Sequence, residues 1–139
     1  MAKLPEEVIE ALESDGKKCM LATVNEDGSL NLVPIGSIRA IGDDKLAYGC
    51  CFDGKTTRNL KEGRKKVAIA IWKPRLEGFQ VKGALQEMHD SGELFDELSS
   101  WVNPMMEKMG INCKVQSVAV IKVTEVYALT IPIAGERMA

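Results

Sequence analysis

The stretch CMLATVNEDGSL, residues 19–30, is the part of the sequence that most directly indicates the fold class. Its first half is an apolar run of strand length, and the Asp27-Gly28 pair after it is a strong signal for a tight turn between antiparallel strands. We therefore expect a β-hairpin with a return strand over residues 30–41. Pro34 and Gly36 interrupt that return strand, which indicates an edge position, a bulge or a close approach of another group to the backbone.

Strand patterns continue after this hairpin. A turn at residues 42–45 precedes an apolar segment at 46–48, and the continuous apolar run at 67–72 is typical of a buried strand. Residues 79–85 alternate moderately, and a long strand is expected over 115–129. Several antiparallel strands in hairpin order predict a mainly β domain, either a small barrel or a sandwich.

Three helices are expected, one before the first strand over residues 4–13 and two between strands over residues 56–63 and 91–109. The third has an apolar face, and Pro104 should kink or split it. A core position is the ordinary explanation for such a face, and a ligand cavity lined by its tryptophan and methionines is the alternative. The apolar face comprises Leu94, Leu98, Trp101, Val102, Met105 and Met109.

The composition is that of a single soluble domain spanning residues 1–139. The 18 Lys and Arg residues nearly balance the 20 Asp and Glu residues, so a general nucleic-acid binder is not expected. No stretch approaches the roughly 18 apolar residues of a membrane span. The four cysteines have no C-x-x-C pair and no zinc-like spacing, which favours free thiols, no bound metal and a cytoplasmic location.

The charge is unevenly distributed, because residues 55–75 contain eight cationic residues and a single acid, Glu62. Lys55, Thr56 and Thr57 follow Gly54 where a short helix is expected to begin. A helix start exposes unpaired N–H groups and partial positive charge, so hydroxyls and a lysine placed there suit a phosphate group. The alternative is that Thr56 is an ordinary N-cap and that the cations form a solvated face.

Residues 49–56 also match the nucleotide-binding pattern G-x-x-x-x-G-K-[ST]. The expected strand, loop and helix agree with that pattern locally. However, such a loop belongs to a parallel α/β sheet, whereas this chain is built from hairpins. The strand at 67–72 also ends without an aspartate that could support a magnesium ion. The match therefore indicates a phosphate more than a nucleoside triphosphatase.

The order of these features resembles the FMN-binding split-barrel family, the pyridoxamine 5′-phosphate oxidase-like proteins, and especially its short FMN-binding-protein type. The resemblance rests on a Lys-Thr-x-x-Asn-Leu run from Lys55 to Leu60, the hairpin around residues 26–28, the strand interrupted by Pro34, and the apolar strand at 66–72. It covers residues 8–127. It implies a six-stranded antiparallel split barrel of Greek-key-like topology, and a homodimer that holds FMN at the subunit interface.

The resemblance also assigns roles to individual residues. Lys55 and Thr56 would bind the FMN phosphate, while Asn59 would brace the turn. The backbone over residues 34–37 would run beside the isoalloxazine ring, and the loop at 49–52 would border the ribityl chain and phosphate. On the strand at 79–85, two residues would reach the flavin, in some relatives from the partner subunit. The implied cofactor-binding residues are Pro34, Ile35, Gly36, Ser37, Cys51, Lys55, Thr56, Thr57, Arg58, Gln80 and Lys82.

The function implied by the resemblance is an FMN-binding oxidoreductase or an electron-transfer flavoprotein with a small-molecule or protein redox partner. Pyridoxamine-phosphate oxidase activity itself is not expected, because the chain lacks the family's Arg-Leu-Ala-Pro-like and Ser-Arg-Lys motifs. No side chain is identified as a catalytic acid or base. The alternative function is a non-catalytic binding or sensor domain for a flavin, a deazaflavin or another phosphorylated ligand.

A few other side chains have two possible roles. His89 is the single histidine, and we interpret it as a polar turn residue more readily than as a haem ligand. Cys50 and Cys51 are either small packing residues or redox-active thiols. The remaining candidates are aromatic residues that either contact a flavin or belong to the core. They are Tyr48, Phe52 and Trp72.

Overall fold

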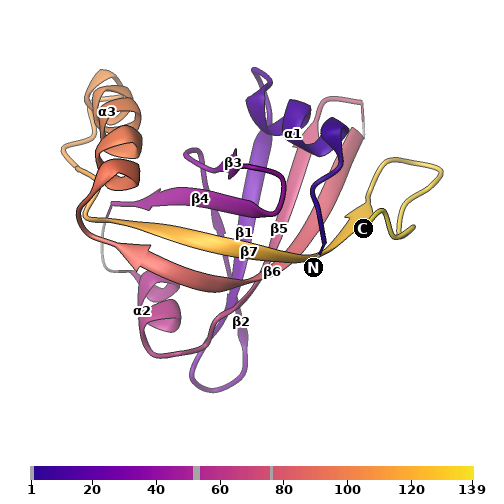
Figure 1. The fold of residues 1–139 in the computed structure, drawn as a ribbon, viewed down its shortest axis with the longest axis horizontal. Coiled ribbons are helices and arrows are strands. Elements are labelled where there is room, and N and C mark those ends of the chain that lie inside the picture. Colours follow the sequence, from indigo (N-terminus) through magenta and orange to yellow (C-terminus); the bar gives the residue numbers. More distant parts are fainter. Residues whose placement is uncertain (1, 52–53, 76) are drawn as a thin grey trace.

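The computed structural model describes residues 2–51, 54–75 and 77–139, and within them the chain forms one antiparallel sheet with three helices (Figure 1). The elements are α1 (Glu6–Glu13), β1 (Lys18–Val24), β2 (Leu30–Pro34), β3 (Arg39–Ile41), β4 (Lys45–Cys50), α2 (Lys55–Lys61), β5 (Lys66–Lys73), β6 (Glu77–His89), α3 (Glu93–Lys108) and β7 (Ser117–Ala128). The mainly β class is confirmed. None of the described helices is both long and apolar enough to cross a membrane.

The hairpin expected around Asp27-Gly28 joins β1 to β2. Val24 pairs with Leu30 beside the turn, and Gly28 has a φ of 86°, a conformation that glycine adopts without strain. The Asp27 carboxylate accepts the backbone N–H of Ser29 at 2.9 Å, which closes the turn. The local turn signal in the sequence therefore predicted this part of the fold correctly.

The single return strand expected over residues 30–41 is wrong, because the structure divides it into β2 and β3. These two strands lie at opposite edges of the seven-stranded sheet, whose order is β2-β1-β5-β6-β7-β4-β3. The chain crosses from one edge to the other just after Pro34, which has no N–H to continue a ladder. The six expected strands become seven for this reason.

The crossing residues fasten the two edges of the sheet to each other. The N–H of Ile35 donates to the carbonyl of Cys19 in β1 at 3.0 Å, and the Ser37 hydroxyl accepts the N–H of Gly49 in β4 at 3.1 Å. The sheet is strongly curved, so the crossing closes it into a split barrel (Figure 1). Residues 35–38, which we call the crossing segment, therefore join β1 and β4 on the rim of the barrel.

The main core lies inside the curved sheet. Leu21, Ile69, Val81 and Ile121 point inward from four strands and are fully buried, each contributing about 1.5–3 kcal/mol of hydrophobic stabilisation. The apolar face of α1 covers this core. Gly83 lies where β6 and β7 approach so closely that a Cβ would come within 2.4 Å of the Lys122 carbonyl oxygen.

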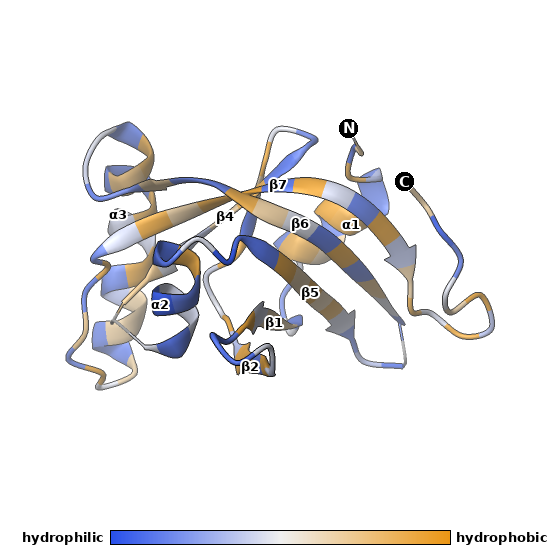
Figure 2. Ribbon diagram, turned by 90° about the horizontal axis from the view of Figure 1, so that it is seen from below, coloured by the Kyte–Doolittle hydropathy of each residue, from blue (hydrophilic) through white to orange (hydrophobic). Residues whose placement is uncertain are grey.

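A second, smaller core lies under α3, where Leu98 and Val102 pack against Ala47 and Val118. The third helix is continuous through Pro104, so the predicted split is wrong. Figure 2 shows α2 and α3 at one end of the barrel, with both chain termini towards the other, and α2 is mostly hydrophilic. The end of the barrel that carries α2 and α3 is the end that holds the site described next.

Candidate functional site: a cavity with an apolar wall and a cationic corner

A cavity of about 210 Å³ lies between the crossing segment, the end of β4, the start of α2 and α3. One wall is apolar or weakly polar, and one corner carries hydroxyl groups and a cation. The described residues that line it are Val33, Pro34, Ile35, Gly36, Ser37, Tyr48, Gly49, Cys50, Cys51, Gly54, Lys55, Thr56, Thr57, Met105 and Met106.

The structure brings eight of the predicted cofactor-binding residues together around this cavity. These eight come from three separate segments of the chain, which sequence spacing alone does not relate. Phe52 and Asp53, which belong to the predicted loop, lie outside the described residues. The eight are Pro34, Ile35, Gly36, Ser37, Cys51, Lys55, Thr56 and Thr57.

In the crossing segment, side chains fix the path of the backbone. The hydroxyl of Ser37 is buried and is used by both the N–H and the carbonyl of Gly49. The N–H of Ile35 is used by β1, whereas no hydrogen bond among the described residues involves the N–H of Gly36. The contribution of this segment to a ligand is therefore a backbone edge, held in place by Ser37.

The start of α2 supplies the cationic corner. The N-cap residue of this helix is Gly54, which has no side chain to cap it, and the first intrahelical bond runs from the N–H of Arg58 to the carbonyl of Gly54 at 3.0 Å. The amides of Lys55 and Thr56 thus have no intrahelical acceptor. The Thr56 hydroxyl accepts a hydrogen bond from the Asn31 amide at 3.0 Å and keeps its proton to donate. This corner can therefore bind an anion.

Asn59 braces α2, as predicted. Its buried amide nitrogen donates to the Thr23 hydroxyl at 2.9 Å and to the Asn25 side chain at 3.0 Å. Its amide oxygen accepts from the guanidinium of Arg64 at 3.1 Å, and Arg64 also donates to the carbonyl of Val24 at 2.9 Å. This network anchors α2 to β1, so the position of Lys55 and Thr56 is set by side chains that do not line the cavity.

Tyr48 presents a buried hydroxyl to the site. Its side chain is only 3% exposed and lines the cavity, and the hydroxyl makes no hydrogen bond of normal geometry with the described residues. Burial, and to a lesser extent the neighbouring Cys50 thiol, raises the pKa of Tyr48 far above its usual value, so the group is a neutral donor. A buried hydroxyl without a partner costs stability, and a polar atom of a ligand would satisfy it.

Two methionines of α3 complete the apolar wall. Met105 and Met106 line the cavity, whereas Trp101 is 40% exposed and Met109 is 64% exposed. The expected apolar face is therefore wrong at Trp101 and Met109. Of the tryptophan and methionines considered as lining a cavity, only Met105 and Met106 are among the described residues that line this one. Helical periodicity indicated that the helix has an apolar side without indicating where the cavity lies.

Three predicted residues do not line the cavity. Arg58 is exposed and lies with Lys55 along a neighbouring cleft that also contains Asp27, whose pKa is lowered mainly by hydrogen bonds from Ser29 and slightly by Lys55. Gln80 and Lys82 lie on β6, on the outer face of the sheet, where the Lys82 ammonium is 5.3 Å from the centre of the Tyr127 ring.

The structure also shows the surroundings of the nucleotide-binding pattern and of the single histidine. The strand that follows α2 is β5, and it pairs antiparallel with both β1 and β6, so the nucleotide-binding pattern at 49–56 does not lie in a parallel sheet. His89 is at the end of β6, and its Nε2 lies within hydrogen-bonding distance of a carboxylate oxygen of Glu87, at 2.7 Å. It does not line the cavity, and the described residues contain no group of three or more His, Cys, Asp or Glu that could hold a metal.

Comparisons with known proteins place this fold and cavity in context. No match was found among curated protein sequences. The crystal structure of HupZ from Group A Streptococcus has a TM-score of 0.78 at 23% identity, covering 96% of this chain and 99% of that one. An FMN-binding protein from Syntrophomonas wolfei subsp. wolfei has a TM-score of 0.79 at 22% identity, covering 91% and 86%.

An F420 reductase has a TM-score of 0.64 at 17% identity, covering 88% of this chain and 98% of that one. At these identities the likeness establishes a shared fold. The sequence profile of the family described as pyridoxamine 5′-phosphate oxidase matches residues 4–131, which is nearly the whole chain. The chain therefore belongs to the pyridoxamine 5′-phosphate oxidase family.

Proposed function

We propose that the cavity binds flavin mononucleotide, with the phosphate at the start of α2 and the isoalloxazine ring against the apolar wall. The observation that carries this proposal is the two-ended chemistry of the cavity. Lys55 and Thr56 form an anion-binding corner, while Ile35 and Met106 belong to a wall suited to an aromatic ring. A ligand with a flat ring at one end and a phosphate at the other fits this arrangement.

The described residues fit this ligand in further ways. The unpartnered hydroxyl of Tyr48 and the N–H of Gly36 are donors for polar atoms of the ligand. Charge-assisted hydrogen bonds to a phosphate contribute about 1.5–3 kcal/mol each, so Lys55 and the Thr56 hydroxyl would dominate the affinity. Family membership supports the proposal, as does the likeness to a protein described as FMN-binding.

When bound, the flavin supplies reversible one-electron and two-electron redox chemistry. The residues of this chain bind the cofactor, orient the ring and exclude water. The described lining residues include no His, Asp or Glu. We therefore infer an oxidoreductase or electron-transfer role in which the protein positions the flavin and a small-molecule or protein partner exchanges electrons with it. A sensor role would use the same cavity without turnover.

A deazaflavin is the second candidate ligand, and the likeness to an F420 reductase favours testing it. It shares a fused ring system and a phosphate with FMN, so the same wall and corner would receive it. The two ligands differ in the ring system and in the groups attached beyond the phosphate. A direct comparison of the two affinities distinguishes them.

We also propose that the protein is a homodimer with the cofactor at the subunit interface. The cavity of about 210 Å³ is smaller than the roughly 300–1,000 Å³ usual for such ligands. The outer face of β2 and β5 exposes Leu30, Leu32 and Trp72, with exposed fractions of 76%, 61% and 38%. A second copy packed on this face would bury these side chains. It would also bring Gln80 and Lys82, which lie on the same face, towards the partner's cofactor.

The proposed ligand is tested by purifying the protein and titrating it. We expect a yellow protein, or a colourless one that binds added FMN and quenches its fluorescence, and FMN released on denaturation. A protein that neither carries FMN nor binds it would overturn the proposal. Adding F420 in the same assay shows which ring system the cavity prefers.

The phosphate site is tested with the double variant Lys55→Ala/Thr56→Ala. Loss of two charge-assisted contacts should weaken FMN binding by about 100-fold or more. Lys65→Ala is the matched control, because Lys65 is an exposed cation outside the cavity and should leave the affinity unchanged. Equal affinity in the double variant and the control would refute the assignment.

The dimer is tested with Leu32→Glu, which places a charge on the exposed face of β2. Light scattering should show a monomer, and FMN binding should weaken because the partner's side of the site is lost. Ile133→Glu is the control, since Ile133 is also exposed but lies in the C-terminal segment. A wild-type monomer that binds FMN fully would contradict the proposal.

A further inference from the structure

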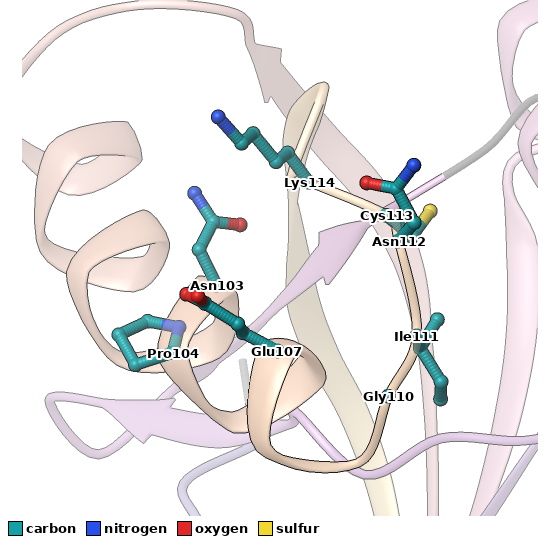
Figure 3. Close-up of a pocket in the computed structure, with 8 residues that line it drawn as sticks. All are labelled: Asn103, Pro104, Glu107, Gly110, Ile111, Asn112, Cys113 and Lys114. Carbon is teal, nitrogen blue, oxygen red and sulfur yellow. The ribbon is translucent and has the colours of Figure 1, made fainter.

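A second and larger cavity, of about 540 Å³, lies at the C-terminal end of α3, and the proposed function does not use it. Figure 3 shows that Asn103, Pro104 and Glu107 line it from the helix, while the loop at residues 110–114 lines the opposite side. Cys113 is in this loop and is half-buried. A small polar reagent in solvent can therefore reach the Cys113 thiol through this cavity.

The Cys113 thiol points to the end of β4. Its sulfur lies 2.8 Å from the backbone carbonyl oxygen of Cys51, a residue 62 positions earlier in the sequence. The Cys51 thiol itself is close enough to interact with that of Cys113, and Cys51 is 9% exposed. The two thiols are thus neighbours, one accessible and one shielded.

The two segments that carry these cysteines are held side by side by the backbone. The N–H of Gln116 donates to the carbonyl of Cys50 at 2.8 Å, and the N–H of Val115 donates to the Asn103 side chain at 2.8 Å. These bonds anchor the segment just after Cys113 to both β4 and α3. The proximity of the two chain segments that carry Cys51 and Cys113 therefore follows from the fold of the backbone.

We propose that Cys51 and Cys113 are a reversible disulfide pair that forms on exposure to a hydroperoxide. The Cys113 thiolate attacks the peroxide and breaks its O–O bond, which gives a sulfenic acid at Cys113 and releases water or an alcohol. The Cys51 sulfur then attacks the sulfenic sulfur, and a second water leaves. Two thiols lose two electrons and two protons in total, and the peroxide accepts both.

The order of these two steps follows from accessibility. Cys113 opens to solvent and meets the oxidant first, whereas Cys51 is buried. Burial, and then the neighbouring Cys113, raises the pKa of Cys51, which disfavours Cys51 as the first nucleophile. The bond would tie the end of β4 to the loop after α3. Because Cys51 also lines the first cavity, the disulfide would change the wall of that cavity beside the proposed cofactor. The disulfide proposal does not require that cofactor.

Peptide mapping of the wild-type protein tests the pair directly. The protein is treated with hydrogen peroxide, free thiols are alkylated, and trypsin releases residues 46–55 and residues 109–114. We expect these two peptides to be joined, to have lost two hydrogen atoms, and to separate on addition of dithiothreitol. Cys19 is on another peptide and should be alkylated as in the untreated protein.

Cys50 shares a peptide with Cys51, so single variants identify the partner. Cys50→Ser should retain the linked peptides, whereas Cys51→Ser and Cys113→Ser should lose them. In Cys51→Ser, a sulfenic acid at Cys113 should accumulate and react with dimedone. The proposal is overturned if wild type gives no linked peptides, if the link persists in Cys51→Ser, or if Cys50 and Cys51 bond to each other instead.

Discussion

The central ladder of β5, β6 and β7 and the cavity at the α2 end of the barrel are built in opposite ways. Eight residues of β5 pair in unbroken register with β6, and the inward side chains alternate with outward ones. At the cavity β2 ends at Pro34, the N-cap residue of α2 is Gly54, which has no side chain, and the Tyr48 hydroxyl lacks a partner among the described residues. The comparison indicates that the ladder is built for stability, whereas the cavity retains a buried polar group that costs stability.

We expect the largest effect on stability from a substitution in the central ladder. Ile121→Ala removes a fully buried side chain from β7 and leaves a cavity in the main core. The free energy of unfolding should fall by about 2–5 kcal/mol. Urea unfolding followed by circular dichroism measures it, and Ile111→Ala, at a residue that is 43% exposed, is the control with a small expected effect. A loss of stability below about 1 kcal/mol would show that Ile121 is not an essential part of the main core.

A smaller loss of stability is expected for Asn59, which anchors α2 to β1. Asn59→Ala removes the amide that bridges Thr23, Asn25 and Arg64, and it leaves buried groups unpaired. Stability should fall by about 1–3 kcal/mol, and FMN affinity should fall with it because α2 loses its anchor. Asn112→Ala, at an exposed amide, is the control. Unchanged affinity in Asn59→Ala would show that the network does not position Lys55 and Thr56.

Tyr48→Phe tests whether the cavity gives up stability for function. Removing a buried hydroxyl that lacks a partner should leave the ligand-free protein as stable as wild type, or more stable by up to about 1 kcal/mol, while weakening FMN binding. Tyr127→Phe is the matched control, because its hydroxyl donates to Glu125 at 2.5 Å. A marked loss of stability in Tyr48→Phe would mean that the hydroxyl already has a partner.

The smallest expected effect is on the alkaline side of the stability profile. Burial raises the pKa of Tyr48 above the value of about 10 in the unfolded chain, so the unfolded state loses its proton first. Stability from this group is complete below about pH 10 and is lost as the pH rises. Urea unfolding near pH 8 and pH 10.5 should therefore show a steeper decline for wild type than for Tyr48→Phe. An equal decline in the stability of the two proteins would contradict a raised pKa of Tyr48.

The sequence predicted local features of the ladder well and the barrel closure poorly. Asp27-Gly28 predicts its hairpin because a turn is specified by its own residues. The crossing after Pro34 brings residues 35–38 against β1 and β4, two strands that are distant in sequence and do not pair with each other. Pro34 and Gly36 could therefore mark the break without revealing where the chain goes next. The prediction of a single strand over residues 30–41 failed for that reason.

The candidate site also combines a part that the sequence predicts with a part that it does not. The position of Lys55 and Thr56 at the start of α2 could be predicted, because the two residues are adjacent and follow Gly54. The apolar wall could not, since Met105 and Met106 come from a helix whose packing is settled only by the tertiary structure. The roles of Gln80 and Lys82, the homodimer, the redox partner and the cytoplasmic location stay predictions.

The comparison of FMN with riboflavin tests the central claim most directly, because the two ligands share the ring and differ in the phosphate. Titration of wild-type protein by flavin fluorescence should show FMN binding at least tenfold more tightly than riboflavin. That ratio corresponds to at least one charge-assisted contact, worth about 1.5 kcal/mol, at Lys55 and Thr56. Equal affinities, or tighter binding of riboflavin, would contradict an anion-binding corner at the start of α2.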